Sequence, residues 1–340
     1  MTDVGRQLRL ASRLELGLLL AGLLLLLLGA SVGSTGFESV LKAWSDPLAL
    51  QIVWDIRLPR TLGAWSAGAL LGLAGALAQG LFRNPLADPY LLGSASGASL
   101  GVALALMLFG VSPFATEWLL RLGLTGAAFA GAVAAVLLTL TLAQGVQHTL
   151  RLLLAGVIVG VVLGAMTSLV MLMNPEVMQS MQAFMLGSTG FVGWSAWVLM
   201  VGAWLACMAV AWLLSPVLDG LSLGEATAAS LGLPLAQMRA ALVAVLALAT
   251  GAAVAQTGLI AFVGLAAPHL VRSVTKTTHR RLVFLSSLMG GVLLMAADVL
   301  ARGLLAPQEL PVGVLTAVLG GGYLLWLMQR STRSVSGTGL

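Results

Sequence analysis

Residues 57–98 read RLPRTLGAWSAGALLGLAGALAQGLFRNPLADPYLLGSASGA, and this stretch decides how the chain is built. Two arginines, Arg57 and Arg60, open a run of small and apolar residues that is long enough to cross a bilayer. The run ends at a proline-containing polar turn over 83–89, and a Gly- and Ser-rich segment follows. Charge at one end and a turn at the other predict a membrane-spanning helix with two exposed ends.

The rest of the chain has the same character. Its 340 residues are 59% hydrophobic and 9% charged, with a mean hydropathy of +1.02, whereas soluble domains are about 25% charged. We therefore predict an all-α polytopic membrane protein that forms a single transmembrane domain over residues 1–340. The net charge of +5 is typical of basic loops that set membrane orientation, and it does not indicate nucleic-acid binding.

A helix needs about 20 apolar residues to cross a bilayer. This criterion predicts ten spans, the first of them a retained helix rather than a cleaved signal peptide. An even number of spans puts both termini on one side, and the basic residues concentrate in the loops of that side, which predicts cytoplasmic termini. The predicted spans are 14–34, 61–81, 91–110, 119–142, 152–172, 191–214, 239–257, a short one at 258–273, 282–302 and 311–329.

Small residues are frequent within the predicted spans. Gly68, Gly72 and Gly75 share one face of the second helix, and in lipid such residues let helices approach closely. We expect a tight helix contact on that face. Residues 60–89 and 239–268 also echo one another, with an Ala-Gln pair near the far end of each helix, which suggests an inverted repeat.

The sequence contains no pattern of reactive groups typical of an enzyme. It has no HExxH motif and no Cys/His cluster, so we predict neither a catalytic residue nor a metal site. Its only lysines, Lys42 and Lys276, do not follow a glycine, so the chain lacks the phosphate-binding pattern GxxxxGK[ST]. We expect no cofactor on this chain, and any use of ATP and Mg²⁺ belongs to a separate ATPase subunit.

A polar cytoplasmic loop is predicted over 215–238. Ser222 and Glu225 have the spacing of a helix-capping box, and Gly224 lies between them. Gly232 comes where this short helix should stop. The apolar residues of this short helix are Leu223, Ala226 and Leu231. They either insert into a groove on a partner or lie on the membrane surface, and the sequence leaves both interpretations open.

Three arginines lie on the predicted outer side. Arg57 and Arg60 stand at the mouth of the second span, and Arg302 follows Asp298 by four residues, a spacing at which the two charges can neutralise each other. Helix-end arginines that reach toward the membrane surface are the simpler interpretation. The alternative is a basic rim that docks an acidic extracytoplasmic partner.

At this point the residues resemble a known family, the FecCD-type permeases, which are membrane subunits of ABC importers for ferric siderophores, heme and cobalamin. The resemblance covers nearly the whole chain. It is carried by Arg57-Leu-Pro-Arg60, Gln79, Asn84-Pro-Leu-Ala-Asp-Pro89, Leu92-Gly-Ser-Ala-Ser-Gly-Ala98, Leu223-Gly-Glu225, Gly258 to His269 with Arg272, Ala297-Asp298 with Arg302, and Glu309-Leu-Pro-Val-Gly313.

The resemblance implies a type II ABC importer permease fold in the bacterial inner membrane. It also implies the partners: a second copy of this chain, two ATP-binding cassette subunits and a periplasmic substrate-binding protein. Alternating access would move the cargo, whose identity among siderophore, heme and cobalamin the sequence leaves open. An ion-coupled secondary carrier is the alternative, but it would need ionisable residues deep in the bundle, and Asp298 beside Arg302 is the one candidate.

The resemblance also assigns roles to individual residues. Arg57, Arg60 and Arg302 match positions that meet acidic residues of the binding protein, and Ser222 to Leu233 match the coupling helix of the ATPase contact. The fifth helix, which carries several methionines, would line the pathway. The inner gate is assigned to Asn84, Leu86, Thr149 and Leu150, and the pathway lining to Met166, Thr167 and Met171.

Overall fold

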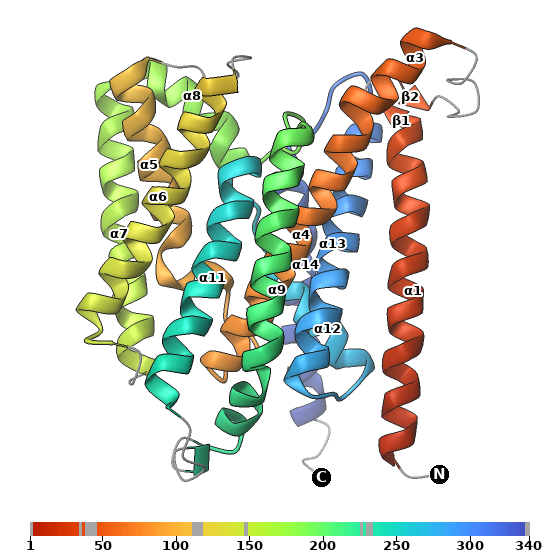
Figure 1. Ribbon diagram of the computed structural model, residues 1–340, viewed down its shortest axis with the longest axis vertical. Helices are drawn as coiled ribbons and strands as arrows, with labels where there is room; N and C mark the ends of the chain where they lie inside the picture. Colours follow the sequence, from red (N-terminus) through yellow and green to blue (C-terminus); the bar gives the residue numbers. More distant parts are fainter. Residues whose placement is uncertain are drawn as a thin grey trace.

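The computed structural model describes residues 3–33, 36–37, 46–110, 118–145, 149–224, 227–228 and 234–336. These residues form a bundle of long helices, and a two-residue antiparallel ribbon, β1 (Val32–Gly33) with β2 (Gly36–Phe37), is added at one end (Figure 1). The helices are α1 (Asp3–Ser31), α3 (Pro47–Ile52), the π-helical turn η1 (Val53–Arg57), α4 (Leu58–Leu81), the 3-10 turn η2 (Pro89–Leu92), α5 (Ser94–Phe109), α6 (Trp118–Leu142), α7 (Thr149–Met173), α8 (Pro175–Leu186), α9 (Trp194–Ser222), α11 (Leu235–Thr257), α12 (Val263–Val274), α13 (His279–Gly303) and α14 (Val312–Ser336).

The prediction of a helical membrane protein is confirmed. By length and composition, seven of the described helices can cross a membrane: α1, the continuous segment from Pro47 to Leu81, α6, α7, α9, α11 and α13. Helix α5 and the first part of α14 are apolar but shorter, and α12 has 12 residues, which is about 18 Å of helix. The count of ten crossings therefore stays a prediction.

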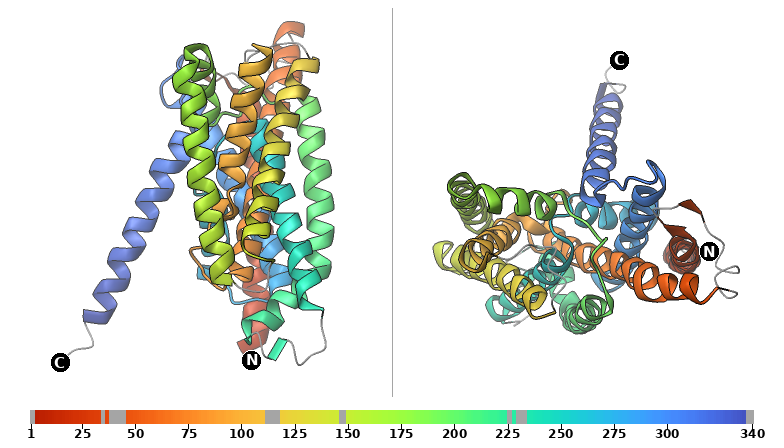
Figure 2. Two further views of the ribbon diagram at one scale, coloured as in Figure 1. Left: turned by 90° about the vertical axis from the view of Figure 1, so that its left-hand side faces the viewer. Right: turned by 90° about the horizontal axis from the view of Figure 1, so that it is seen from above.

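Both chain ends lie at the same end of the bundle, where α1 begins and α14 finishes (Figure 1). We call this the terminal end. Helices α4 and α9 run toward it, and α7, α11 and α13 run away from it. Figure 2 shows that α14 leans away from the other helices, so that much of its surface is exposed.

Helix α4 lies at the centre of the protein. From Pro59 to Leu81 every residue except Leu62 and Trp65 is buried. Helices α13, α12, α11 and α9 surround it. A helix enclosed in this way needs small residues wherever a neighbouring backbone comes close.

The predicted glycine face of α4 is that close contact, and the prediction is confirmed. A Cβ atom on Gly68 would collide with the carbonyl oxygen of Gly290 in α13, and one on Gly72 would collide with the carbonyl of Ser286. Gly75 faces the carbonyl of Gly264 in α12 in the same manner. The spacing therefore sets α4 directly against the backbones of two later helices.

Helix α9 continues past the predicted end of the sixth span at residue 214. Pro216 lies inside it and has no N–H to donate to the carbonyl of Trp212. The hydroxyl of Ser215 donates to this carbonyl at 2.8 Å instead. The helix therefore ends later than predicted, because this neighbouring side chain satisfies the backbone group that the proline leaves open. The cytoplasmic location of residues 215–238 stays a prediction.

The predicted eighth span is also shorter than expected. Residues 258–262 are not helical, and α12 begins only at Val263. The non-helical backbone is satisfied inside the protein, because Leu259 N donates to Phe184 O at 3.0 Å and the Tyr90 hydroxyl donates to Ile260 O at 3.1 Å. Helix α8, which supplies Phe184, was not predicted, although Asn174-Pro175-Glu176 is typical of a helix start.

The glycine face gives a test of packing. Gly75→Ala places a methyl group against the Gly264 backbone, which cannot move away as a flexible side chain can, and we expect a loss of about 1–3 kcal/mol of stability. Gly202→Ala in α9 is the matched control, because nothing lies within 4 Å of its Cβ position. The thermal unfolding midpoint of the purified protein should fall for the first variant and hold or rise for the second. Equal midpoints would contradict the contact.

Candidate functional site

Charged residues from two helices and a loop gather at the end of the bundle opposite the terminal end. The Nε of Arg60 on α4 lies 3.2 Å from Asp298 Oδ1, and the Nε of Arg302 on α13 lies 3.0 Å from Asp298 Oδ2. From the loop before α14, Glu309 Oε2 lies 2.8 Å from Arg60 Nη1. We refer to Arg60, Asp298, Arg302 and Glu309 as the arginine cluster.

Asp298 is the centre of the arginine cluster and has no exposed surface. Besides the two guanidinium groups, its Oδ1 accepts a hydrogen bond from the Thr189 hydroxyl at 2.5 Å. A buried carboxylate without partners would be very unfavourable, and these three donors remove that penalty. The predicted pairing of Asp298 with Arg302 is confirmed. The contacts with Arg60 and Thr189 were not predicted, because they join residues 238 and 109 positions apart.

Arg302 and Arg57 also donate hydrogen bonds to the last carbonyl groups of α1. Arg302 Nη1 donates to the carbonyl of Gly29 at 3.0 Å, and Arg57 Nη1 lies 3.3 Å from the carbonyl of Ala30 and 3.4 Å from that of Ser31. The last carbonyls of a helix have no partner within the helix, and they carry its negative dipole end. Two arginines satisfy them here, which anchors α1 to α4 and α13.

These contacts show how the three arginines of the expected basic rim are held, and their docking role stays a prediction. Arg57, Arg60 and Arg302 are 6%, 8% and 1% exposed, so the structure does not present three open guanidinium groups to an approaching protein. They are buried because α1 needs donors at its last turn and Asp298 needs counter-charges. Glu309, whose side chain is 32% exposed, is the outermost member of the arginine cluster.

A second polar link joins α4 to α12 near the terminal end. The side-chain oxygen of Gln79 accepts from Nη1 and Nη2 of Arg272, at 2.6 and 2.5 Å. The side-chain nitrogen of Gln79 donates to the carbonyl of Leu265 at 3.2 Å. Gln79 thus ties the last turn of α4 to both halves of α12.

The expected inner gate lies in the turn after α4 and at the start of α7, both at the terminal end. Asn84 shapes the turn, because its Oδ1 accepts from Leu86 N at 2.9 Å. Leu86 is 56% exposed and Leu150 is 70% exposed, so both are available for contacts outside this chain. Thr149 is the first residue of α7, and its side chain lies outside the described part.

The segment that follows this turn, η2 and Gly93, packs against α7. A Cβ on Gly156 would collide with the carbonyl of Leu91 in η2, and Gly93 lies close to Val159. Gly93 has a φ of +80°, a backbone conformation that favours glycine. The turn from α4 to α5 is therefore packed directly on α7.

The predicted coupling segment is described only in part. Ser222 is the last residue of α9, with its hydroxyl donating to Asp219 O at 2.6 Å, and Leu223 is 69% exposed. Gly224 has a φ of +111°, which ends the helix in a turn. The other predicted coupling residues lie outside the described residues: Glu225, Ala226, Leu231 and Gly232.

The end of α9 is joined to the start of α13. The carboxylate of Asp219 accepts from the backbone N–H of His279 at 3.0 Å and lies 2.7 Å from Nδ1 of the same histidine. A carboxylate at a helix N-terminus is favourable because the helix dipole is positive there. This contact therefore fixes the end of α9 to the start of α13.

Only part of the expected pathway lining is exposed. Met166 is 48% exposed on α7, but Thr167 is 3% exposed and donates to Leu163 O at 2.9 Å. Met171 packs against a hydrophobic cluster that includes Ala98 and Met181. Thr167 is therefore buried within this chain and Met171 is partly buried, because successive helix residues point about 100° apart. Pathway lining by these three residues stays a prediction.

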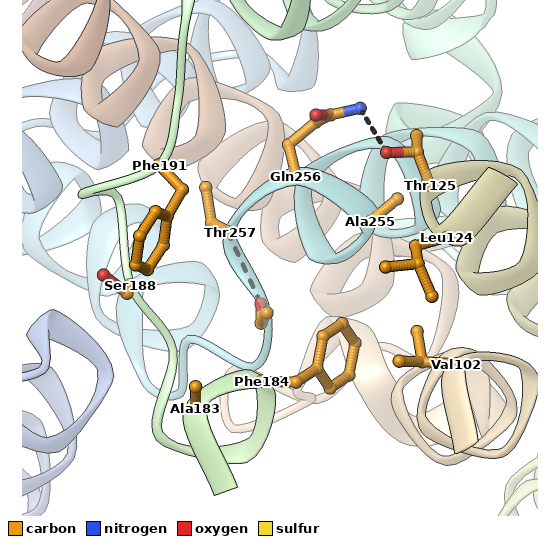
Figure 3. A pocket seen from close by; sticks show the side chains of 11 residues that line it. Val102, Leu124, Thr125, Ala183, Phe184, Ser188, Phe191, Ala255, Gln256 and Thr257 are labelled. Carbon is orange, nitrogen blue, oxygen red and sulfur yellow. Dashed lines mark hydrogen bonds between the residues drawn. The ribbon is translucent and has the colours of Figure 1, made fainter. Parts of the chain in front are cut away.

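A partly open pocket lies at the opposite end, between α5, α6, α8 and α11 (Figure 3). Its volume is about 120 Å³, and Gln256 Nε2 donates to Thr125 Oγ1 at 3.4 Å on one wall. Phe184 and Phe191 line the other side. Drug-sized ligands occupy roughly 300–1,000 Å³, so this pocket has room for small molecules such as water but not for a bulky chelate.

Metal ligation receives no support from the described part of the chain. No group of three or more His, Cys, Asp or Glu side chains there is arranged to hold a metal ion. The carboxylates of the arginine cluster are already paired with guanidinium groups. The residues described so far define a polytopic helical membrane protein with polar links at both ends of its central helix.

Comparison with known proteins gives the family. The sequence matches the FecCD transport family over residues 17–330, and the chain belongs to that family. It is 39% identical over 338 residues to the hemin transport system permease protein HmuU of Yersinia pestis, covering 97% of this chain and 99% of that protein. It is 39% identical over 297 residues to the vitamin B12 import system permease protein BtuC of Escherichia coli, covering 85% and 87%.

A solved structure agrees with this membership. A protein described as a metal-chelate type ABC transporter, in an inward-facing conformation, superimposes with a TM-score of 0.83 at 28% identity, covering 93% of this chain and 98% of that one. The chain is thus a permease of the FecCD transport family, and its relatives include hemin and vitamin B12 permeases. The resemblance identified from the motifs is confirmed.

The arginine cluster gives a stability prediction. Asp298→Asn removes the buried carboxylate that Arg60 and Arg302 share, and we expect a loss of about 3–5 kcal/mol. Asp55→Asn on the exposed side of η1 is the control and should change stability by less than about 0.5 kcal/mol. Thermal unfolding of both variants in the same detergent measures the difference. An unfolding midpoint for Asp298→Asn equal to that of the control would show that the cluster is not a structural centre.

Proposed function

We propose that this chain is the membrane-spanning subunit of an ATP-driven importer for a bulky chelate of the heme, cobalamin or ferric-siderophore type. The family match over residues 17–330 carries the proposal. The lack of a phosphate-binding loop in the sequence supports it, because ATP hydrolysis must then occur in a separate subunit. We propose the location that the family resemblance implies, which is the bacterial inner membrane with both termini in the cytoplasm.

The proposed architecture is the type II permease fold with ten crossings and two inverted halves. Helices α4 and α11 support the inverted relation, since they lie against each other and run in opposite directions (Figure 1). The echo between residues 60–89 and 239–268 lies on these two helices and the segments after them.

We also propose that two copies form the pathway between them. Helix α14 leans away from its own bundle and exposes apolar side chains such as Val318 and Leu325, which are 67% and 63% exposed (Figure 2). Helix α7 exposes Val161 and Leu172, at 67% and 80%. A second copy would cover part of this surface and lipid the rest.

In the proposed mechanism, the ATPase subunits act on the coupling segment after α9. Leu223 is exposed at this point, and the link from Asp219 to His279 would carry the movement to α13. Helix α13 packs against α4, and Gln79 joins α4 to α12. Movement at the coupling segment would thus shift the helices beside the gate turn at Asn84 and Leu86 and open the pathway alternately to each side.

An ion-coupled carrier receives less support. Such a carrier needs an ionisable group that can bind and release its ion. Asp298 was the candidate, but two guanidinium groups and a hydroxyl already surround its carboxylate. Its link through Arg60 to the partly exposed Glu309 fits an extracytoplasmic contact better, and we propose that the substrate-binding protein docks at this end.

Reconstituted transport tests the function. Proteoliposomes that contain this chain and its ATPase subunit should take up labelled chelate only when ATP is inside and the binding protein outside. A non-hydrolysable ATP analogue is the control and should abolish net uptake. Uptake by this chain alone, independent of ATP, would contradict the importer and favour a carrier.

Cross-linking tests the second copy. Cys207 is the one cysteine in the sequence and is 1% exposed, so a surface cysteine can be labelled selectively. Val318→Cys on α14 should form a cross-linked dimer in membranes treated with a thiol-reactive bifunctional reagent. Leu24→Cys on α1, 58% exposed, is the matched control and should remain monomeric. Equal yields from both variants would contradict an interface at α14.

A further inference from the structure

Arg60 connects a buried carboxylate to an exposed one. Its Nε contacts Asp298, which is fully buried, and its Nη1 contacts Glu309, whose side chain is 32% exposed. Arg60 itself is 8% exposed, and Glu309 is the more exposed of its two carboxylate partners, so an external group that reaches this guanidinium would take the position of the Glu309 carboxylate. The ligand that fits there is another anionic oxygen, because a guanidinium only donates hydrogen bonds.

Glu309 belongs to the segment that leads into α14. Residues 303–309 are exposed. The segment is held by Leu310 N, which donates to Ala301 O at 3.0 Å, and by the ion pair from Glu309 to Arg60. Helix α14 begins three residues after Glu309, at Val312. The ion pair therefore attaches the start of α14 to the central helix α4.

We propose that Glu309 pairs with Arg60 only while no partner is bound. When an acidic protein partner docks, one of its carboxylates replaces Glu309 on Arg60. This inference rests on the proposed docking of a substrate-binding protein. The exchange leaves the charge around Arg60 unchanged, so the guanidinium never loses its counter-charge. It also removes the side-chain contact that holds residues 303–309, which loosens this segment and lets docking at this end affect the start of α14.

The exchange explains how a buried arginine takes part in docking. One exposed ion pair is broken and a similar one forms, so the contact contributes little net affinity and mainly selects a partner that carries a carboxylate at this point. A partner without one would leave Glu309 in place and the segment before α14 attached. Docking and release of the segment before α14 are then linked by the same side chain.

Binding measurements test the exchange. The full permease complex is placed in nanodiscs and titrated with the fluorescently labelled substrate-binding protein that is encoded with it. Glu309→Gln removes the competing charge with little change of shape, and we expect binding to tighten by about two- to fivefold. Asp55→Asn removes one exposed carboxylate from the same end of the bundle and should change the affinity less than Glu309→Gln does.

The other outcomes overturn the inference. Weaker binding by Glu309→Gln would mean that Glu309 itself contacts the partner, and an equal gain in both variants would mean that only general charge repulsion was removed. A nitroxide on Gln308→Cys gives a second readout, independent of affinity. Docking should increase its mobility in the parent protein, whereas with Glu309→Gln it should already be mobile. An unchanged spectrum on docking would also overturn the exchange.

Failure of this inference is distinct from failure of the proposed function. ATP-dependent uptake together with an unaltered affinity for Glu309→Gln would leave the importer intact and remove the exchange. Absence of binding-protein docking to the parent complex, in preparations that hydrolyse ATP, would contradict the docking role on which both depend.

Discussion

The close contact of α4 with α13 and α12 is the constraint on which the rest of the structure depends. Three glycines bring the backbones together, and a single added methyl group would meet a carbonyl oxygen at each of them. Lipid supplies no hydrophobic force between helices, so such contacts are what hold a membrane bundle together. With α4 held at the centre, both of its ends are available for polar links: Arg60 at one end and Gln79 at the other.

The polar groups of the bundle follow one physical requirement, which is that buried charges and backbone groups need partners. Arg302 shows this most clearly, since one guanidinium satisfies both Asp298 and a carbonyl at the end of α1. Ser215 meets the same need next to Pro216, and Tyr90 meets it for the non-helical segment before α12. These side chains allow helix ends and breaks inside an otherwise apolar protein.

In the proposed transport cycle, the polar contacts at the helix ends are the ones that change. Packed helices shift as units, whereas ion pairs at their ends can exchange partners. Asp219 joins α9 to α13 at the terminal end, and Glu309 joins the α14 segment to α4 at the opposite end. The central helix therefore lies between the proposed ATPase contact and the proposed docking contact. This arrangement gives one physical route by which each partner influences the other.

The sequence by itself determined the fold class, most of the helices, the glycine contact on α4 and the pairing of Asp298 with Arg302, because hydropathy and helical spacing are local properties. Only the tertiary structure decided that Arg57 and Arg60 turn inward, that Thr167 faces the inside of the chain and that Glu309 meets Arg60. The helix that was predicted to end at residue 214 continues past Pro216, since the side chain of Ser215 satisfies the carbonyl that the proline leaves open. The partners of Arg60 lie hundreds of residues away in sequence, and helix packing alone brings them together.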